Sequence, residues 1–187
     1  MLHAPVQGGL ELRQEGSTTV IAGRFPYGEV ATLSDTGRPR REVFAPGAFN
    51  ARTADPEAEI HLLSGHDFNR PLASRKGGSL TLQETPEGLA FEARIPPEVT
   101  DTTHARDALA LIRSGLAVGL SPGFRVPPNG ATVEERDGGL LRTIREAQLF
   151  ELSIVTRPAY EAAQVEARSW TPTRTAAPVH ALRRWMP

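Results

Sequence analysis

The alternation of apolar and polar residues along the chain predicts a mainly β protein. Short runs of alternating or β-branched residues are separated by many of the 17 glycines and 16 prolines, which is typical of strands joined by turns. Neighbouring runs joined by only a few residues are predicted to pair as hairpins. The expected strands span residues 9–14, 18–25, 59–67, 79–85, 88–95, 116–126, 131–137, 140–148 and 149–156.

Helical signals interrupt this pattern in two places. Residues 45–53 carry Pro46 at a first-turn position, which is a favoured place for proline in a helix. Residues 100–115 combine threonine and aspartate caps with apolar residues at helical spacing and Gly115 as a stop. A third, shorter helical turn is expected at 159–164. The fold class expected from these patterns is therefore mainly β with flanking helices (α+β).

The length of 187 residues and the hydrophobic content of 39% fit one well-buried domain. From Ser169 onward the sequence loses its periodicity and gains proline. We therefore predict a folded domain over residues 1–168 and a flexible tail over residues 169–187.

Charge and cysteine content exclude several classes of protein. A net charge of −1, from 21 basic and 22 acidic residues, supplies no field that would hold nucleic acid or an anionic membrane. The absence of cysteine excludes disulfides, thiolate zinc sites and a cysteine nucleophile. No apolar run approaches the roughly 20 residues that span a bilayer, and the first residues lack the pattern of a signal peptide. A cytoplasmic protein without direct nucleic-acid or membrane binding is expected.

The segment LAVGLSPGFRV, residues 116–126, has an unusually bare face. On a strand, Ala117, Gly119, Ser121 and Gly123 share one side, while the larger apolar residues share the other. Glycines weaken a strand, so such a face is usually kept where another backbone or a ligand must come close. A peptide substrate fits that description. Alternatively, the face receives a helix and the serine only forms a local hydrogen bond.

The letters GLSPG also match the G-x-S-x-G nucleophile elbow of the α/β-hydrolases, but three features disfavour that fold. The following residues, GFRVPPNG, cannot form the helix that an elbow requires. Pro122 has no N–H to donate to an oxyanion. His180, which follows in the predicted tail, is the only later histidine that could complete a triad.

A serine nucleophile needs a nearby base, and histidine is the usual one. Of the five histidines, His3 and His180 lie in the expected tails and His104 lies on a surface helix. His66 ends its strand at a turn that can present an imidazole at the rim of a cleft, whereas His61 lies within the strand. His66 is therefore the preferred base, although a histidine in such a turn can instead bind loop carbonyls.

Glu151 interrupts the apolar strand 149–156, where a half-buried carboxylate needs a partner. A histidine would serve, because the carboxylate of a triad fixes the tautomer of its imidazole. Alternatively, Glu151 faces water or pairs with an arginine. His61, His66 and Asp67 match no standard spacing of metal ligands, and neither a metal nor a cofactor is expected.

Taken in order, five stretches resemble the prohead (capsid maturation) proteases of tailed bacteriophages and of phage-derived particles such as gene-transfer agents. Each stretch alone is weak, but the ordered set is specific. The family is related in fold to the herpesvirus assemblins, so the resemblance implies an assemblin-like β-barrel surrounded by helices. The stretches, within about residues 10–168, are EVFAPGAF, HLLSGHDFNRPLA, GLAFEARIP, DALALIRSGLAVGLSPGFRV and ELSIVTRPAYEAAQV.

The resemblance implies a serine protease in which Ser121 is the nucleophile, His66 is the general base and Glu151 orients the imidazole. Ser153 or Asp67 could replace Glu151 as the third member of the triad.

Because Pro122 cannot donate a hydrogen bond, the oxyanion must be met by another amide or by water. The candidates are the Gly123 N–H and the Arg157 region, since assemblins use an arginine-bearing segment there.

The resemblance further implies an endopeptidase inside a procapsid in the producing cell. It would remove scaffold segments from the major capsid protein precursor and often clip itself. An extended peptide would bind beside the bare strand, and both a monomer and a homodimer stay open. Two other classes also stay open: a non-catalytic capsid assembly factor with the same fold, and an unrelated β-barrel binding module.

Overall fold

The computed structural model of the chain describes residues 4–6, 10–34, 37–117 and 119–156. These residues form three sheets and three short helices, so the mainly β prediction is confirmed. The expected closed β-barrel is not what they form. Each of the three sheets is open, because its outermost strands pair with no strand of another sheet within the described residues.

The first sheet has five antiparallel strands built from two hairpins and a short N-terminal strand. Strand β9 pairs with β3 and thereby joins the two hairpins, both of which the sequence pattern predicts. The strands, in spatial order, are β1 (Ala4–Val6), β2 (Leu10–Glu15), β3 (Thr18–Pro26), β9 (Gly88–Ile95) and β8 (Leu80–Thr85).

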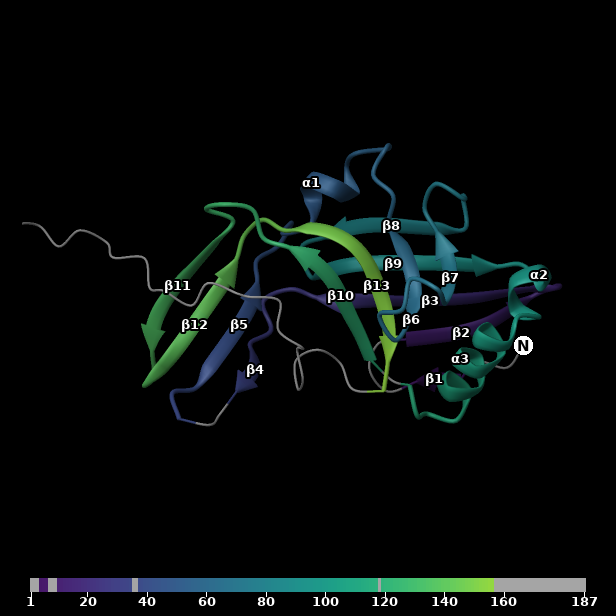
Figure 1. The fold of residues 1–187 in the computed structure, drawn as a ribbon, viewed down its shortest axis with the longest axis horizontal. Helices are drawn as coiled ribbons and strands as arrows, with labels where there is room; N and C mark the ends of the chain where they lie inside the picture. The colour runs from purple at the N-terminus through teal and green to yellow at the C-terminus, as the bar shows by residue number, and fades with distance from the viewer. Residues whose placement is uncertain (1–3, 7–9, 35–36, 118, 157–187) are drawn as a thin grey trace, which may run out of the picture.

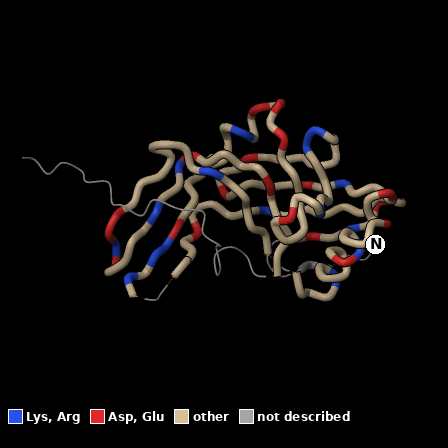
Figure 2. The backbone as a smooth tube through the Cα atoms, in the orientation of Figure 1, with Lys and Arg blue, Asp and Glu red and all other residues tan. Residues whose placement is uncertain are grey.

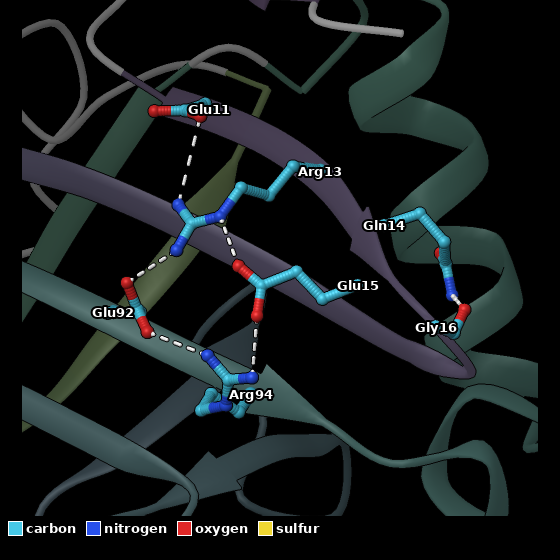
Figure 3. Close-up of polar contacts among 7 residues, drawn as sticks. All are labelled: Glu11, Arg13, Gln14, Glu15, Gly16, Glu92 and Arg94. Carbon is cyan, nitrogen blue, oxygen red and sulfur yellow. Dashed lines mark hydrogen bonds and ion pairs between the residues drawn. The ribbon is translucent and has the colours of Figure 1, made fainter. Parts of the chain in front are cut away.

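Alternating charges cover one face of this sheet (Figure 3). Arg13 bonds Glu15 and Glu92 at 2.8 and 2.6 Å, and Arg94 bonds the same two carboxylates at 2.6 and 3.2 Å. The register places Val20 of β3 between the two arginines, and Val20 is fully buried. The long arginine side chains therefore cover a valine that would otherwise face solvent.

The second sheet carries the candidate site, and Figure 1 shows its strands crossing in front of the first sheet. Side chains of both sheets belong to one buried core. Strand β13 is antiparallel to β10 on one side and parallel to β6 on the other, so β10 is an edge strand of this sheet within the described chain. The strands, in order, are β10 (Gly119–Arg125), β13 (Gln148–Val155), β6 (His61–Ser64) and β7 (Pro71–Ser74).

The third sheet lies at the end of the molecule opposite the helix α3 (Thr103–Arg113) (Figure 1). The predicted hairpin of β11 and β12 turns at Asp137 and Gly138, both with positive φ, as a type I′ hairpin turn requires. Strand β5 pairs with β12 in parallel, and the paired Arg142 and Glu42 form a buried ion pair at 3.2 Å. The strands, in order, are β11 (Ala131–Arg136), β12 (Gly139–Ile144), β5 (Arg40–Phe44) and β4 (Ala31–Ser34).

The predicted long helix is confirmed as α3 (Thr103–Arg113), which follows the short α2 (Pro97–Thr100). The Thr102 side chain caps α3 by accepting the Ala105 N–H, and the chain leaves the helix through Gly115 at φ +70°.

The first predicted helix is shorter than expected. Residues 45–53 yield only α1 (Asn50–Thr53), because Gly47 adopts φ +75° and interrupts the helical path. The helical turn expected at 159–164 and the tail expected at 169–187 lie outside the described residues.

A cluster of aromatic rings connects the three sheets. The Phe44 ring lies 5.1 Å from those of Phe25 and Phe124 and 5.2 Å from that of Phe49. These residues come from β5, β3, β10 and the turn before α1, so the cluster fixes the end of β10 against the rest of the core.

Acidic and basic residues are interspersed along the described chain (Figure 2). Within that part of the chain, no helix has the length and apolar character needed to cross a membrane.

Candidate active site

The register of β10 and β13 brings the predicted serine and glutamate onto one face of the second sheet. Ser121 is paired with Ser153, and Gly123 is paired with Glu151. Because alternate residues of a strand point to the same side, all four share one face. Both β10 residues named here belong to the bare face that the sequence predicts.

His66 reaches this face from the turn between β6 and β7. Gly65 and His66 adopt φ values of +67° and +62°, which turn the chain at the end of β6. The Gly65 N–H donates to the carbonyl of Ile154 at 3.1 Å, so the turn is attached to β13. A left-handed conformation costs a non-glycine residue about 1–2 kcal/mol, and the contacts around His66 must offset this cost.

The imidazole of His66 and the carboxylate of Glu151 are in direct contact. His66 Nδ1 lies 2.7 Å from Glu151 Oε1; the Glu151 side chain is 4% exposed and that of His66 is 45% exposed. With a carboxylate as acceptor, Nδ1–H is the donor, which leaves Nε2 of the neutral ring free to accept a proton. The hydrogen bond that Glu151 accepts raises the pKa of His66 above its ordinary value. Partial burial opposes this increase, and the attraction between the two charges adds to it.

A second oxygen of the same carboxylate is held by Ser153. Ser153 Oγ donates to Glu151 Oε2 at 2.6 Å and accepts the backbone N–H of His66 at 2.9 Å. The alternatives of Glu151 facing water or pairing with an arginine are therefore not what the structure shows. The sequence suggested Ser153 only as a substitute for Glu151, whereas the structure places it beside that residue as a hydrogen-bond partner.

Gly123 lies directly below the carboxylate. A Cβ atom at this position would meet Glu151 Oε1 at 2.1 Å and Glu151 Cδ at 2.7 Å. Part of the bare strand face is thus occupied by a side chain from the neighbouring strand. The role of the Gly123 N–H as an oxyanion donor stays a prediction.

Ser121 is 2% exposed. The hydrogen bonds of the described residues include none between its hydroxyl and the imidazole of His66. Directly paired residues have Cβ atoms about 5 Å apart, so Ser121 lies beside Ser153, which holds the backbone of His66. The structure thus joins His66 to Glu151 directly and places Ser121 on the same face, opposite Ser153.

The other sequence candidates have different partners. Asp67 caps its own turn: Oδ1 accepts the Asn69 N–H at 2.8 Å, and Oδ2 lies 3.3 Å from Arg70 Nε. The ring of His61 packs edge-on against Phe68, with the centroids 5.9 Å apart.

The histidines and carboxylates of residues 4–6, 10–34, 37–117 and 119–156 form no group of three or more that could hold a metal ion. Arg157, which the resemblance suggested as oxyanion support, lies outside these ranges.

Comparison with known proteins assigns the chain to a protein family. A family model described as Caudovirus prohead serine protease matches residues 10–176. No curated protein and no solved structure matches the chain.

Proposed function

Since the chain belongs to the Caudovirus prohead serine protease family, a family of capsid maturation proteases, we propose that Ser121, His66 and Glu151 form its catalytic triad. The observation that carries the proposal is the 2.7 Å contact between His66 Nδ1 and Glu151 Oε1, on the strand face that also bears Ser121. The proposed reaction is hydrolysis of a peptide bond through an acyl-enzyme, without a metal or cofactor.

In this mechanism His66 Nε2 removes the proton from Ser121 as the hydroxyl attacks the scissile carbonyl. Glu151 keeps Nδ1 protonated and stabilises the imidazolium that forms. The imidazolium then gives its proton to the leaving amine, and water hydrolyses the acyl-enzyme by the same route. The raised pKa of His66 supports the assignment, because a partner that favours the imidazolium also makes the neutral ring a stronger base.

Substrate binding is proposed to occur along β10. An edge strand can pair with an extended peptide through its main chain. Pro122 has no N–H and is tolerated in a strand where its nitrogen faces the unpaired edge, so a bound peptide would lack one hydrogen bond next to Ser121. Ser121 is 2% exposed. Acylation therefore requires the residues that cover Ser121 to move when the peptide binds.

The proposed substrates are scaffold segments of the major capsid protein precursor, cut inside the procapsid. Enzyme and substrate confined in one shell meet at high effective concentration, so tight binding is unnecessary. The oxyanion donors are proposed to be the Gly123 amide, the Arg157 region or a bound water, because Pro122 cannot serve.

The test is co-expression of the chain with the capsid protein precursor from the same genome. We expect the wild type to shorten the precursor and Ser121→Ala to leave it intact. Ser114→Ala is the matched control, since this exposed serine at the end of α3 only donates to the carbonyl of Leu111. Mass spectrometry of the capsid protein gives the cleavage site.

Normal processing by the Ser121→Ala variant would refute the triad. Particles that form with an intact precursor, in the presence of a folded wild-type chain, would favour the assembly-factor alternative.

A further inference from the structure

Ser153 combines two properties that the proposed chemistry does not use. It is fully buried, and its one hydroxyl contacts two functional residues at once. A hydroxyl has a single proton to donate, and here that proton goes to Glu151 Oε2 at 2.6 Å. One of the remaining lone pairs accepts the His66 N–H at 2.9 Å. The hydroxyl is therefore fixed in orientation by its two partners.

The donation to Oε2 decides how the carboxylate is placed. The terminal torsion of a glutamate is broad and roughly two-fold, so it is a poor determinant of orientation by itself. With Oε2 bound to Ser153 and Gly123 leaving room below, Oε1 is directed at His66 Nδ1. A hydrogen bond to a charged acceptor is among the stronger ones in proteins.

The accepted N–H decides where the His66 turn lies relative to β13. The hydrogen bonds of Asp67 shape the turn internally but do not attach it to that strand. Among the described main-chain amides of the turn, Gly65 N–H and His66 N–H donate to β13, to the Ile154 carbonyl and to Ser153 Oγ. The serine hydroxyl thus supplies a contact that offsets the unfavourable left-handed conformation of His66.

We propose that Ser153 is a positioning residue for the triad: its hydroxyl holds the backbone of the base and the orienting carboxylate in one fixed relation. This inference rests on the proposed function. It assigns Ser153 no contact with substrate and no step of proton transfer.

The test measures kcat and KM of Ser153→Ala on a peptide that spans the cleavage site, together with labelling of Ser121 by a fluorophosphonate. A misplacement of about 1 Å can cost about 100-fold in rate, so we expect kcat and the labelling rate to fall about 10- to 100-fold. KM should stay within about two-fold. Ser153→Thr, which keeps the hydroxyl, should recover most of the activity, and Ser64→Ala on the adjacent strand is the control.

A double-variant comparison separates positioning from a general structural effect. If Ser153 acts through the carboxylate, adding Ser153→Ala to Glu151→Ala should cost much less than it costs the wild type. Should Ser153→Ala fail to fold, Ser153→Cys takes its place, because it leaves no cavity and its thiol donates only weakly.

Wild-type kcat in Ser153→Ala would overturn the inference and leave the proposed function standing. An equal fractional loss in the Glu151→Ala background would also overturn it. A folded wild-type chain that neither cleaves nor labels would overturn the proposed function itself.

Discussion

Replacing Gly123 with alanine tests the arrangement of the site most directly. The added Cβ would lie 2.1 Å from Glu151 Oε1, 2.7 Å from Cδ and 2.8 Å from Cγ, whereas ordinary contacts begin at 3.4 Å. The carboxylate must therefore retreat by roughly 1 Å or more, and it must do so against its hydrogen bonds to His66 and Ser153.

The magnitude follows from this displacement. A shift of about 1 Å costs about 100-fold in rate, and complete loss of the orienting carboxylate in a triad costs about 10⁴-fold. We expect kcat of Gly123→Ala to fall between these limits, with a loss of about 1–3 kcal/mol in the free energy of unfolding from overpacking. An oxyanion role of Gly123 alone predicts little change, because alanine retains the N–H.

The assay is steady-state cleavage of the junction peptide, with unfolding in denaturant measured in parallel. Gly77→Ala is the control, because Gly77 has no positive φ and its Cβ would come no closer than 3.3 Å to any atom, the nearest being Ser74 Oγ. Adding Glu151→Ala to Gly123→Ala removes the overlap, so stability should recover while kcat stays low. A kcat within about three-fold of wild type in Gly123→Ala would refute the reasoning.

Three further perturbations address other parts of the molecule. In Glu151→Gln the pKa of His66 should fall, because the hydrogen bond that raises it is weakened. The neutral base then persists to lower pH, so the acid limb of the kcat/KM profile should move to lower pH while the maximum drops; an unmoved limb would contradict the pairing. Phe44→Ala should lower the free energy of unfolding by about 3–5 kcal/mol in a denaturant titration, since its ring contacts three others in the core. A loss below about 1 kcal/mol would show that the cluster does not hold the sheets together. Glu92→Gln should change stability by less than about 1 kcal/mol, because the ion pairs it makes are partly exposed, and high salt should abolish the difference. A larger, salt-insensitive loss would indicate that this network is more than a surface feature.

Local sequence patterns predict the hairpins and the long helix well, because both depend on neighbours in the chain. The alternation in β2, β3, β8 and β9 and the caps of α3 are features of this kind. Local patterns fail where one residue redirects the backbone or where a strand is very short. Gly47 turns most of the first expected helix into a turn, and β4, β5 and β7 are too short for alternation to reveal them.

The pairing of distant strands has no local signal. The parallel pairs β5–β12 and β6–β13 join segments far apart in the chain. The residues of one strand do not indicate which distant strand it pairs with. The closed barrel expected from the family resemblance is wrong for the described residues for a related reason. Closure depends on pairing between edge strands of different sheets, and the sequence of an edge strand does not show whether it has such a partner.

The candidate site also has some features that local sequence patterns reveal and others that depend on the pairing of distant strands. The preference for His66 over His61 follows from its place in a turn. A carboxylate in an apolar strand marks Glu151 as needing a partner, and its expected role beside His66 comes from the family resemblance. The link through Ser153 depends on the β6–β13 pairing, which brings residues 66 and 153 together. Gly123 belongs to the bare strand face on which the sequence predicts the close approach of a ligand or another backbone. The group that lies against Gly123 is instead the side chain of Glu151.

The central position of β13 has a consequence for when the chain can act. This strand lies between β10, which bears Ser121, and β6, which leads to His66, and it is the last strand of the described chain to be synthesised. Until the ribosome has released it, Ser121 and His66 have no common support, and His66 lacks the carboxylate of Glu151. Incomplete translation products are therefore expected to be inert, so synthesis itself delays the onset of proteolysis.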